Sequence, residues 1–164
     1  MQVYLDFIDE LVLLVNLATN EKKQNTSLTI CRNLYPYYRS FARKEDDATL
    51  VSNAIAFCEQ EFAKPEKDTV MLNQFMAKIE KLMPNNPEAQ TWKESYAMNA
   101  LSAVHELLMF TKNSDNQHVI DICSLLIDNV DFEINDENED INDDQIYEHP
   151  KMISTMAQIK EMLQ

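Results

Sequence analysis

Apolar positions recur at steps of three and four residues along most of the chain, the pattern of amphipathic helices. In the first such segment, about residues 2–19, the apolar face holds Val3, Tyr4, Phe7, Ile8, Leu11, Leu14, Val15 and Ala18. A polar stretch, Asn20 to Asn25, follows it. The pattern then predicts a helix capped by Thr26 or Ser27 and broken or kinked at Pro36, because proline lacks the N–H that a helix interior needs. Two more predicted helices run from Asp46 or Asp47 to about Phe62, and from Thr69 to a stop at Pro84.

The second half of the chain continues the same pattern. Asn86-Pro87-Glu88 has a capping side chain, a proline suited to the first turn and an acid for the helix dipole, so it predicts the start of a fifth helix. The inward row of this long helix runs from Trp92 to Leu108 and contains alanines that allow close packing. Further helices are expected from Asp115 and from Pro150. The prediction is an all-α, single-domain bundle of residues 1–164, with about seven helices around a long central helix and no sheet.

Length and composition agree with one folded domain. The chain has 164 residues, of which 45% are hydrophobic and 26% charged, as is usual for globular proteins. Its longest clean apolar run, Leu11 to Val15, is far shorter than a membrane-spanning helix, and acids occupy the amino terminus where a secretory leader would be basic. Cys31, Cys58 and Cys123 are widely spaced in apolar patterns, so we expect reduced core thiols and a cytoplasmic location.

The complete absence of glycine excludes several classes of site. Average usage of about 7% would give about eleven glycines in this length. Phosphate-binding loops and nucleophile elbows need glycine for close backbone approach or a strained turn. Glycine is also favoured in tight hairpins, so a sheet-rich fold is disfavoured. Asparagine is expected to take the left-handed position at helix ends instead.

No residue pattern predicts a catalytic, cofactor or metal site. His105, His118 and His149 are well separated, and His105-Glu106 begins a zincin motif whose second histidine position is Met109. Asp136-x-Asn138-x-Asp140 resembles the start of a calcium loop. The sixth position of that loop is Ile141 instead of glycine, and the twelfth is Tyr147, one residue before Glu148. An enzyme would require the fold to bring His105, His118, Glu106 and the acidic segment together.

Negative charge is concentrated in one third of the chain. Between Lys112 and Lys151 there are twelve acids and no lysine or arginine, against a net charge of −14 for the whole protein. This segment disfavours binding to nucleic acid and to anionic membranes, and it suits a basic protein partner. We expect an acidic linker at about 131–148 before the last helix; the alternative role for its charge is solubility alone. The candidate partner-binding acids are Asp131, Glu133, Asp136, Glu137, Glu139, Asp140, Asp143 and Asp144.

A second candidate surface lies at the predicted helix break. Tyr35-Pro36-Tyr37-Tyr38 and Phe41 concentrate aromatic side chains there. Exposed tyrosines are common binding anchors, whereas alternate members of this cluster are expected to pack inward. Tyr37 and Arg39 are therefore the alternative partner-binding residues.

Short motifs in this order resemble the YjaG-like bacterial proteins, a family of unknown function. They are Cys31, Leu34, Tyr35-Pro36, Tyr38 and Phe41, then Ile79-Glu80 and Pro84, Tyr96-Ala97, Ala100, Ala103, Glu106-Leu107, and finally Glu148-His149-Pro150. The resemblance implies one small all-helical domain and supplies no catalytic residues. The chain departs from it at Arg32-Asn33, where an acidic–basic pair is expected, and at Asn99, where an acid is expected.

Two classes of function follow from these patterns. The first is a non-enzymatic, cytoplasmic bacterial binding protein, such as an immunity or antitoxin-type protein that covers a basic effector. The second is a cryptic hydrolase or metal-dependent enzyme whose site only the fold assembles. A cluster of three histidine or acidic side chains lining one pocket would favour the enzyme. The sequence specifies neither the partner nor the oligomeric state.

Overall fold

The computed structural model describes residues 2–84, 91–138 and 140–164, and every regular element in these ranges is an α-helix. The helices are α1 (Gln2–Leu17), α2 (Asn20–Phe41), α3 (Glu45–Phe62), α4 (Thr69–Leu82), α5 (Trp92–Asn113), α6 (Asn116–Glu137), α7 (Asp143–Glu148) and α8 (Pro150–Leu163). The all-α prediction is confirmed. The short helix α7 is an addition to the seven helices expected from the sequence.

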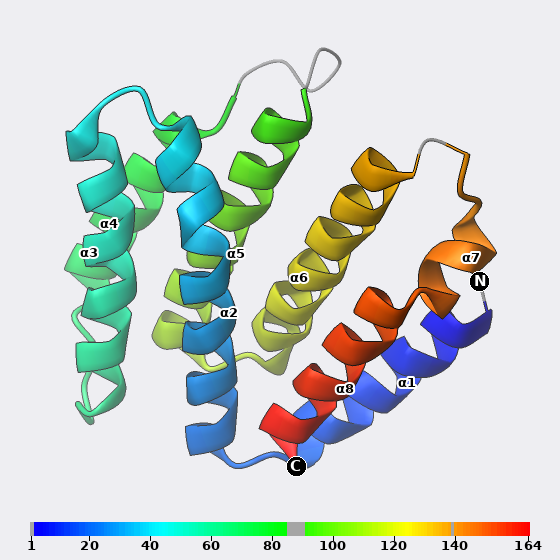
Figure 1. Ribbon diagram of the computed structural model, residues 1–164. Helices are drawn as coiled ribbons and strands as arrows, with labels where there is room; N and C mark the ends of the chain where they lie inside the picture. The colour runs from blue at the N-terminus through cyan, green and yellow to red at the C-terminus, as the bar shows by residue number, and fades with distance from the viewer. Residues whose placement is uncertain (1, 85–90, 139) are drawn as a thin grey trace.

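Helix α5 lies at the centre of the bundle. It packs against α2, α3, α4 and α6 (Figure 1). Helices α3 and α4 lie on one side of the α2–α5–α6 group, and α1, α7 and α8 lie on the other (Figure 1). These contacts confirm the expected central helix. Its alanines Ala97, Ala100 and Ala103 are buried, and their small side chains allow neighbouring helices to approach closely.

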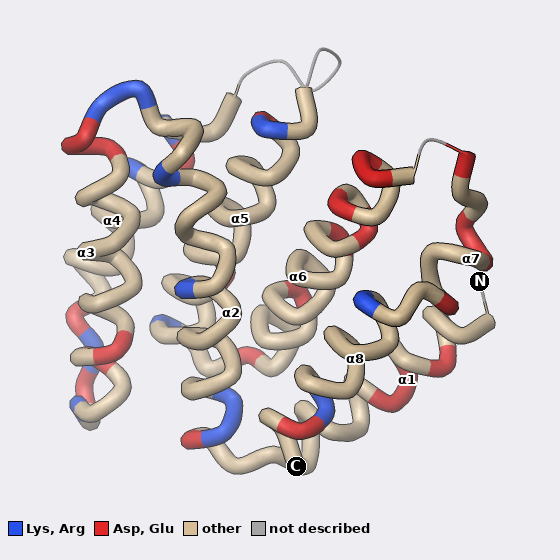
Figure 2. The backbone as a smooth tube through the Cα atoms, in the orientation of Figure 1, with Lys and Arg blue, Asp and Glu red and all other residues tan. Residues whose placement is uncertain are grey.

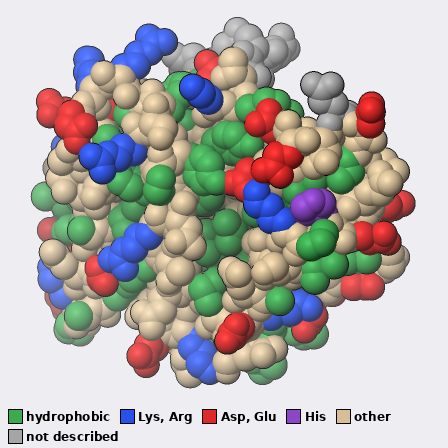
Figure 3. Space-filling view, in the orientation of Figure 1, with side chains coloured by type: hydrophobic (Ala, Val, Ile, Leu, Met, Phe, Trp, Pro, Cys, Tyr) green, Lys and Arg blue, Asp and Glu red, His purple; other side chains and the backbone are tan. Residues whose placement is uncertain are grey.

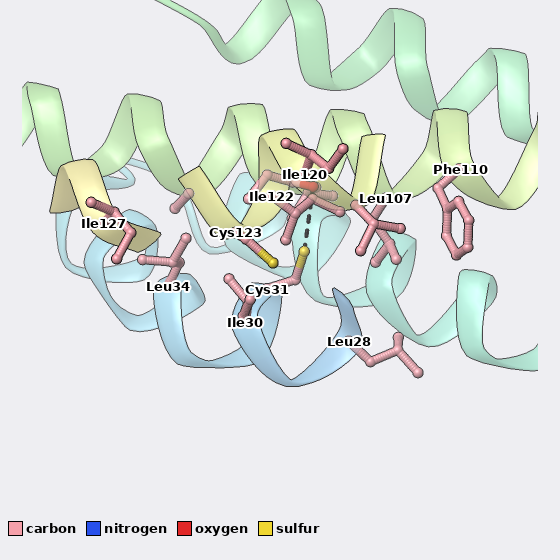
Figure 4. Packing of buried hydrophobic residues seen from close by; sticks show 14 of the residues in the cluster. Leu28, Ile30, Cys31, Leu34, Leu107, Phe110, Ile120, Ile122, Cys123 and Ile127 are labelled. Carbon is pink, nitrogen blue, oxygen red and sulfur yellow. Dashed lines mark hydrogen bonds between the residues drawn. The ribbon is translucent and has the colours of Figure 1, made fainter. Parts of the chain in front are cut away.

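One continuous hydrophobic core joins the helices, and all three cysteines are part of it. Cys31 on α2 and Cys123 on α6 pack among leucine and isoleucine side chains (Figure 4). The Cys31 thiol donates to the carbonyl oxygen of Ala103 at 3.3 Å. Burial raises the pKa of the Cys58 and Cys123 thiols to about 12. The prediction that the three cysteines are free core thiols is confirmed, and their raised pKa disfavours the thiolate form that a nucleophile needs.

Helix α2 begins earlier than predicted and is not broken at its proline. It starts at Asn20, where the Thr19 side chain accepts the Lys22 N–H, and it continues through Pro36 to Phe41. Proline in a helix interior costs about 3 kcal/mol. Leu34 and Tyr38, on either side of the proline, are 1% and 3% exposed. Burial of these two side chains offsets the cost, and the helix continues.

Helix α5 begins at Trp92, where Thr91 and Glu94 form a reciprocal capping box. The Asn86-Pro87-Glu88 start predicted from the sequence lies outside the described residues. At the other end, Ser114 adopts φ 58° and caps the helix before α6 begins. Among the described residues this is the one positive φ, so the left-handed position is taken by serine and not by the asparagine expected.

Most of the segment expected to be an acidic linker is helical. Helix α6 extends to Glu137 because Val130 and Ile134 continue its buried face. Helix α7 then begins after Asn142, which forms a capping box with Gln145, and Ile146 packs into the core. The acids of this segment are therefore held on defined helix surfaces.

Helix α1 packs on α6, α7 and α8 and leaves several apolar side chains exposed, including Leu5, Leu13 and Leu17. Its acidic residues Asp6 and Asp9 are exposed beside them. Across the described ranges, no helix is both long enough and apolar enough to span a membrane.

Candidate functional site

A cleft opens where the last turns of α2 meet the first turns of α5 and the last turn of α6. Its volume is about 720 Å³. We call it the aromatic cleft, and its lining residues are Pro36, Tyr37, Ser40, Phe41, Thr91, Trp92, Lys93, Tyr96 and Asp136. In the space-filling view, hydrophobic side chains gather at the centre of this face, and acidic side chains border them on one side (Figure 3).

Aromatic rings from three helices form a row beside this cleft. The Tyr37 and Tyr96 ring centroids are 5.1 Å apart, and Tyr96 makes an edge contact with Phe132 at 6.3 Å. Trp92 also packs against Phe132, with 5.5 Å between centroids. The sequence placed Trp92 on the inward row of its helix, and that prediction is wrong: its side chain is 43% exposed. The row thus leaves a large indole surface available at the entrance to the cleft.

Glu133 connects three helices at one edge of the aromatic cleft. Its carboxylate accepts the Tyr37 hydroxyl from α2 and forms an ion pair with Lys151 of α8. The Asn129 amide, one turn earlier on α6, donates to it at 3.3 Å. Burial, followed by the Glu133 hydrogen bond, raises the pKa of Tyr37 to about 12. These contacts hold the Tyr37 ring in place against Tyr96.

Acidic residues gather toward the carboxyl end of α6 (Figure 2), and their contacts divide them into two groups. The first group, Glu133, Asp136 and Glu137, lies close to Tyr96 of the aromatic cleft. Burial, followed by the charges of these three acids, raises the pKa of Tyr96 to about 12. Asp136 lines the cleft, and Glu137 lies 3.8 Å from the Lys151 ammonium. We call these three residues the cleft acids.

Asp131 belongs to the second group. Burial and the nearby Asp143 carboxylate raise the pKa of Asp131, whereas burial and Asp131 raise that of Asp128. Burial, followed by the Asp128 and Asp131 charges, also raises the pKa of Tyr4 on α1. The Tyr4 ring stacks on Tyr147 of α7, with centroids 5.0 Å apart.

The predicted partner-binding residues are therefore only partly brought together. Tyr37, Glu133, Asp136 and Glu137 meet at the aromatic cleft. Asp131 and Asp143 lie toward α1, and Asp144 is exposed in the first turn of α7. Asp140 follows the end of α6, and Glu139 lies outside the described residues. Arg39 is exposed in the last turn of α2 and does not line the cleft.

Sequence reasoning missed Trp92, Tyr96 and Phe132 as site residues, because helical periodicity treats any aromatic residue as core. It also missed two buried asparagines. The Asn99 and Asn129 side chains are 8% and 1% exposed, and the structure gives no hydrogen-bond partner among the described residues to Asn99 Nδ2 or Asn129 Oδ1. Nothing in the spacing of these asparagines identifies them as buried.

A group of possible metal ligands lies elsewhere, at the α5–α6 connection. One ligand atom from each of Glu106, His118 and Asp121 lies within 4.8 Å of the other two. His105 points elsewhere and forms an ion pair with Glu80, with 3.0 Å between His105 Nε2 and Glu80 Oε1. A second hollow of about 240 Å³ is lined by Glu80, Met83, Ser102, His105 and Glu106, so it does not include the whole triad. Asp136 lies within α6, which removes the calcium-loop interpretation.

A buried carboxylate that the sequence did not reveal lies at the α3–α4 connection. The Glu61 side chain is fully buried, accepts the Asp68 N–H at 2.7 Å and pairs with Lys64. The Lys64 hydrogen bond, followed by the Asp68 N–H, lowers the pKa of Glu61. This residue fixes the turn between two helices and lies outside the aromatic cleft.

Comparison with known proteins agrees with this architecture. A crystal structure of a DUF416 family protein from Shewanella baltica OS155 superposes with a TM-score of 0.74 at 19% sequence identity, covering 92% of this chain and 80% of that one. At this identity the likeness establishes the fold alone. The search of curated proteins gives no match. The sequence profile of a family described as "Protein of unknown function (DUF416)" matches residues 14–164. With nearly the whole chain matched, this protein belongs to the DUF416 family.

Proposed function

We propose that this protein is a non-enzymatic binding module that takes a basic segment of another protein into the aromatic cleft. The observation that carries the proposal is the juxtaposition of exposed and half-buried aromatic rings with the carboxylate of Asp136 in one cleft of about 720 Å³. Aromatic side chains in a well-formed pocket are common anchors at protein interfaces. A neighbouring carboxylate selects a positively charged group over a neutral or negative one.

Arginine and lysine side chains fit the chemistry of this cleft. Their aliphatic stems pack on apolar surface, and a cation near the face of a tryptophan or tyrosine ring gains about 0.5–2 kcal/mol. Trp92 and Tyr96 supply such rings, and Asp136 supplies the counter-charge. Of the three cleft acids, Glu133 and Glu137 both pair with Lys151, and Asp136 is the one that lines the cleft, so Asp136 is assigned to the incoming cation.

The wider charge distribution supports the same kind of partner. The net charge of −14 favours encounter with a basic protein through long-range attraction. A bacterial immunity or antitoxin-type protein that covers a basic effector in the cytoplasm is the concrete form of this proposal. In that form the cleft holds one anchoring side chain, and the remaining acids of α6 and α7 steer the approach.

Two observations support the enzymatic alternative. Glu106, His118 and Asp121 converge, and three histidine or acidic side chains, Glu80, His105 and Glu106, line the neighbouring hollow. That hollow has a volume of about 240 Å³, against about 720 Å³ for the aromatic cleft, and His118 and Asp121 do not line it. The binding proposal is therefore preferred.

Trp92 gives a direct experiment, because it is the single tryptophan of the chain and it lines the cleft. An arginine-rich nonapeptide is titrated while the indole fluorescence is recorded, with a glutamate-rich nonapeptide as the negative control. The expected result is a saturable change that weakens at least fivefold in Asp136→Asn. Asp46→Asn, which removes the same charge from an exposed position on α3, is expected to bind within twofold of wild type. Equal weakening in both variants would show that only net charge matters, and the cleft proposal would be wrong.

A further inference from the structure

We propose that Glu106, His118 and Asp121 bind a divalent transition-metal ion of the zinc type at the α5–α6 connection. This site is independent of the aromatic cleft and of the proposed protein binding. The three residues come from two helices joined by the short turn at Ser114 and Asp115. Glu106 lies two turns before the end of α5, and His118 and Asp121 lie three residues apart in the first turns of α6, so they share one helix face.

The distances suit a small ion. One ligand atom from each residue lies within 4.8 Å of the other two. Zinc binds nitrogen and oxygen ligands at about 2.0–2.2 Å, so neighbouring ligands around it stand about 3–3.5 Å apart. His118 Nδ1 and Glu106 Oε2 are now 2.6 Å apart, joined by the imidazole proton. A metal ion would replace that proton, with these two atoms moving slightly apart and Asp121 moving slightly closer.

The charge at this position also favours a cation. Two carboxylates face one imidazole, and in the described part of the chain neither Glu106 nor Asp121 forms an ion pair with lysine or arginine. Among the described residues, Asp121 accepts a hydrogen bond from the Gln117 side-chain amide at 2.8 Å. Two nearby acids without a basic partner repel each other, and a divalent ion removes that repulsion.

The donor set indicates the class of metal. One imidazole with two carboxylates suits zinc and similar first-row ions, whereas magnesium and calcium prefer oxygen ligands alone. The side chains of His118 and Glu106 are 15% and 27% exposed, so solvent reaches the position. Three protein ligands therefore leave at least one coordination position to water.

Asn113 supplies a sharper test of the same site. Its Oδ1 accepts the Asp115 N–H at 2.9 Å, so its Nδ2 faces His118 Nε2 at 3.1 Å. With a metal on Nδ1, the neutral imidazole carries its proton on Nε2, and that proton then needs an acceptor. Asn113→Asp would offer one carboxylate oxygen to the Asp115 N–H and the other to the Nε2 proton. An acceptor bonded to the other ring nitrogen of a metal-binding histidine changes metal affinity by about 10–100-fold.

The experiment is calorimetric titration of zinc chloride into the full chain after treatment with EDTA and dialysis. The expected result is binding at one site, weakened at least tenfold in His118→Ala and Asp121→Asn and strengthened about tenfold in Asn113→Asp. His105→Ala is the matched control, because its ring pairs with Glu80 and lies outside the triad. It is expected to bind zinc as the wild type does.

Three results would overturn the proposal: no zinc uptake by wild type up to millimolar concentration, an equal loss in His105→Ala and His118→Ala, or unchanged affinity in Asp121→Asn. If His118→Ala fails to fold, as judged by circular dichroism, Asp121→Asn and Asn113→Asp decide the question because both retain the histidine. Zinc titration involves no peptide, so its outcome is separate from the test of the aromatic cleft.

Discussion

Substitution of Glu133 tests whether the aromatic cleft is built as described. This carboxylate is the common acceptor for the Tyr37 hydroxyl and the Asn129 amide, and its side chain is 17% exposed. Glu133→Ala leaves those two donors without their acceptor. Glu133→Gln keeps an acceptor oxygen and removes the charge.

The expected size of the effect follows from the exposure of each partner. Lys151 is 40% exposed, so its ion pair with Glu133 contributes no more than about 1 kcal/mol. A hydrogen bond to a charged acceptor contributes about 1.5–3 kcal/mol, and a donor left buried without a partner costs about 1–3 kcal/mol. We therefore expect Glu133→Gln to lower the free energy of unfolding by about 1–2 kcal/mol and Glu133→Ala by about 2–4 kcal/mol. At about 2–4 °C per kcal/mol for a chain of this size, Glu133→Ala should melt roughly 4–16 °C lower.

Thermal unfolding followed by circular dichroism measures this loss, and Trp92 fluorescence reports the cleft at the same time. Glu137→Gln is the matched control. It makes the same chemical change one turn along α6 at a side chain that is 62% exposed and lies 3.8 Å from the same lysine. Its expected effect is within about 0.5 kcal/mol. If Glu133→Ala melts like Glu137→Gln, the Tyr37–Glu133 contact does not hold the cleft together and the reasoning is refuted.

Three further predictions follow from the buried ionisable groups. The three thiols should not react with Ellman's reagent in the native protein and should all react in denaturant, because burial raises the pKa of Cys31, Cys58 and Cys123. Rapid labelling of the native protein would contradict this prediction. Absorbance at 295 nm should show four tyrosines, Tyr37, Tyr38, Tyr96 and Tyr147, ionising near pH 12. Because their pKa is raised from 10.0, the stability that they contribute is complete below pH 10 and is lost as the pH rises toward 12. Ionisation of all tyrosines near pH 10 in the folded state would contradict this prediction. Glu61→Gln should lower the free energy of unfolding at pH 7 by about 1–2 kcal/mol, because one hydrogen bond to a charged acceptor is weakened and the exposed Lys64 adds little. Since the pKa of Glu61 is lowered from 4.5, the wild-type advantage is present above that pH and disappears on further acidification. Equal unfolding free energies for Glu61→Gln and wild type at pH 7 would contradict it.

Helical periodicity was sufficient to predict the bundle, because the apolar face of each long helix is buried as a single stripe. It failed where short-range signals competed with burial. Pro36 was predicted to break or kink its helix, whereas the buried Leu34 and Tyr38 keep α2 continuous. The acidic residues between Asp131 and Glu137 were read as a linker, whereas Ile134 at 0% exposure holds them in α6.

The candidate site could be predicted only in parts. Tyr37 and the cleft acids were identified separately, from an aromatic cluster and from a charge pattern. Tyr37 and the cleft acids come together only because α2 packs against α5 and α5 packs against α6. The spacing of residues along the sequence does not specify which helices pack together. The convergence of Glu106 with His118 was hidden for the same reason, because twelve residues and a helix reversal separate them.

A two-dimensional amide spectrum of the labelled protein, titrated with the arginine-rich nonapeptide, tests the central claim most directly. It reports each acidic surface separately, on the same sample. The account predicts the largest shifts at Tyr37, the Trp92 indole N–H, Tyr96 and Asp136, with losses of these shifts in Asp136→Asn. Shifts confined to Asp131, Asp143 and Tyr147 on the α1–α7 side, or no shifts at saturating peptide, would contradict binding at the aromatic cleft.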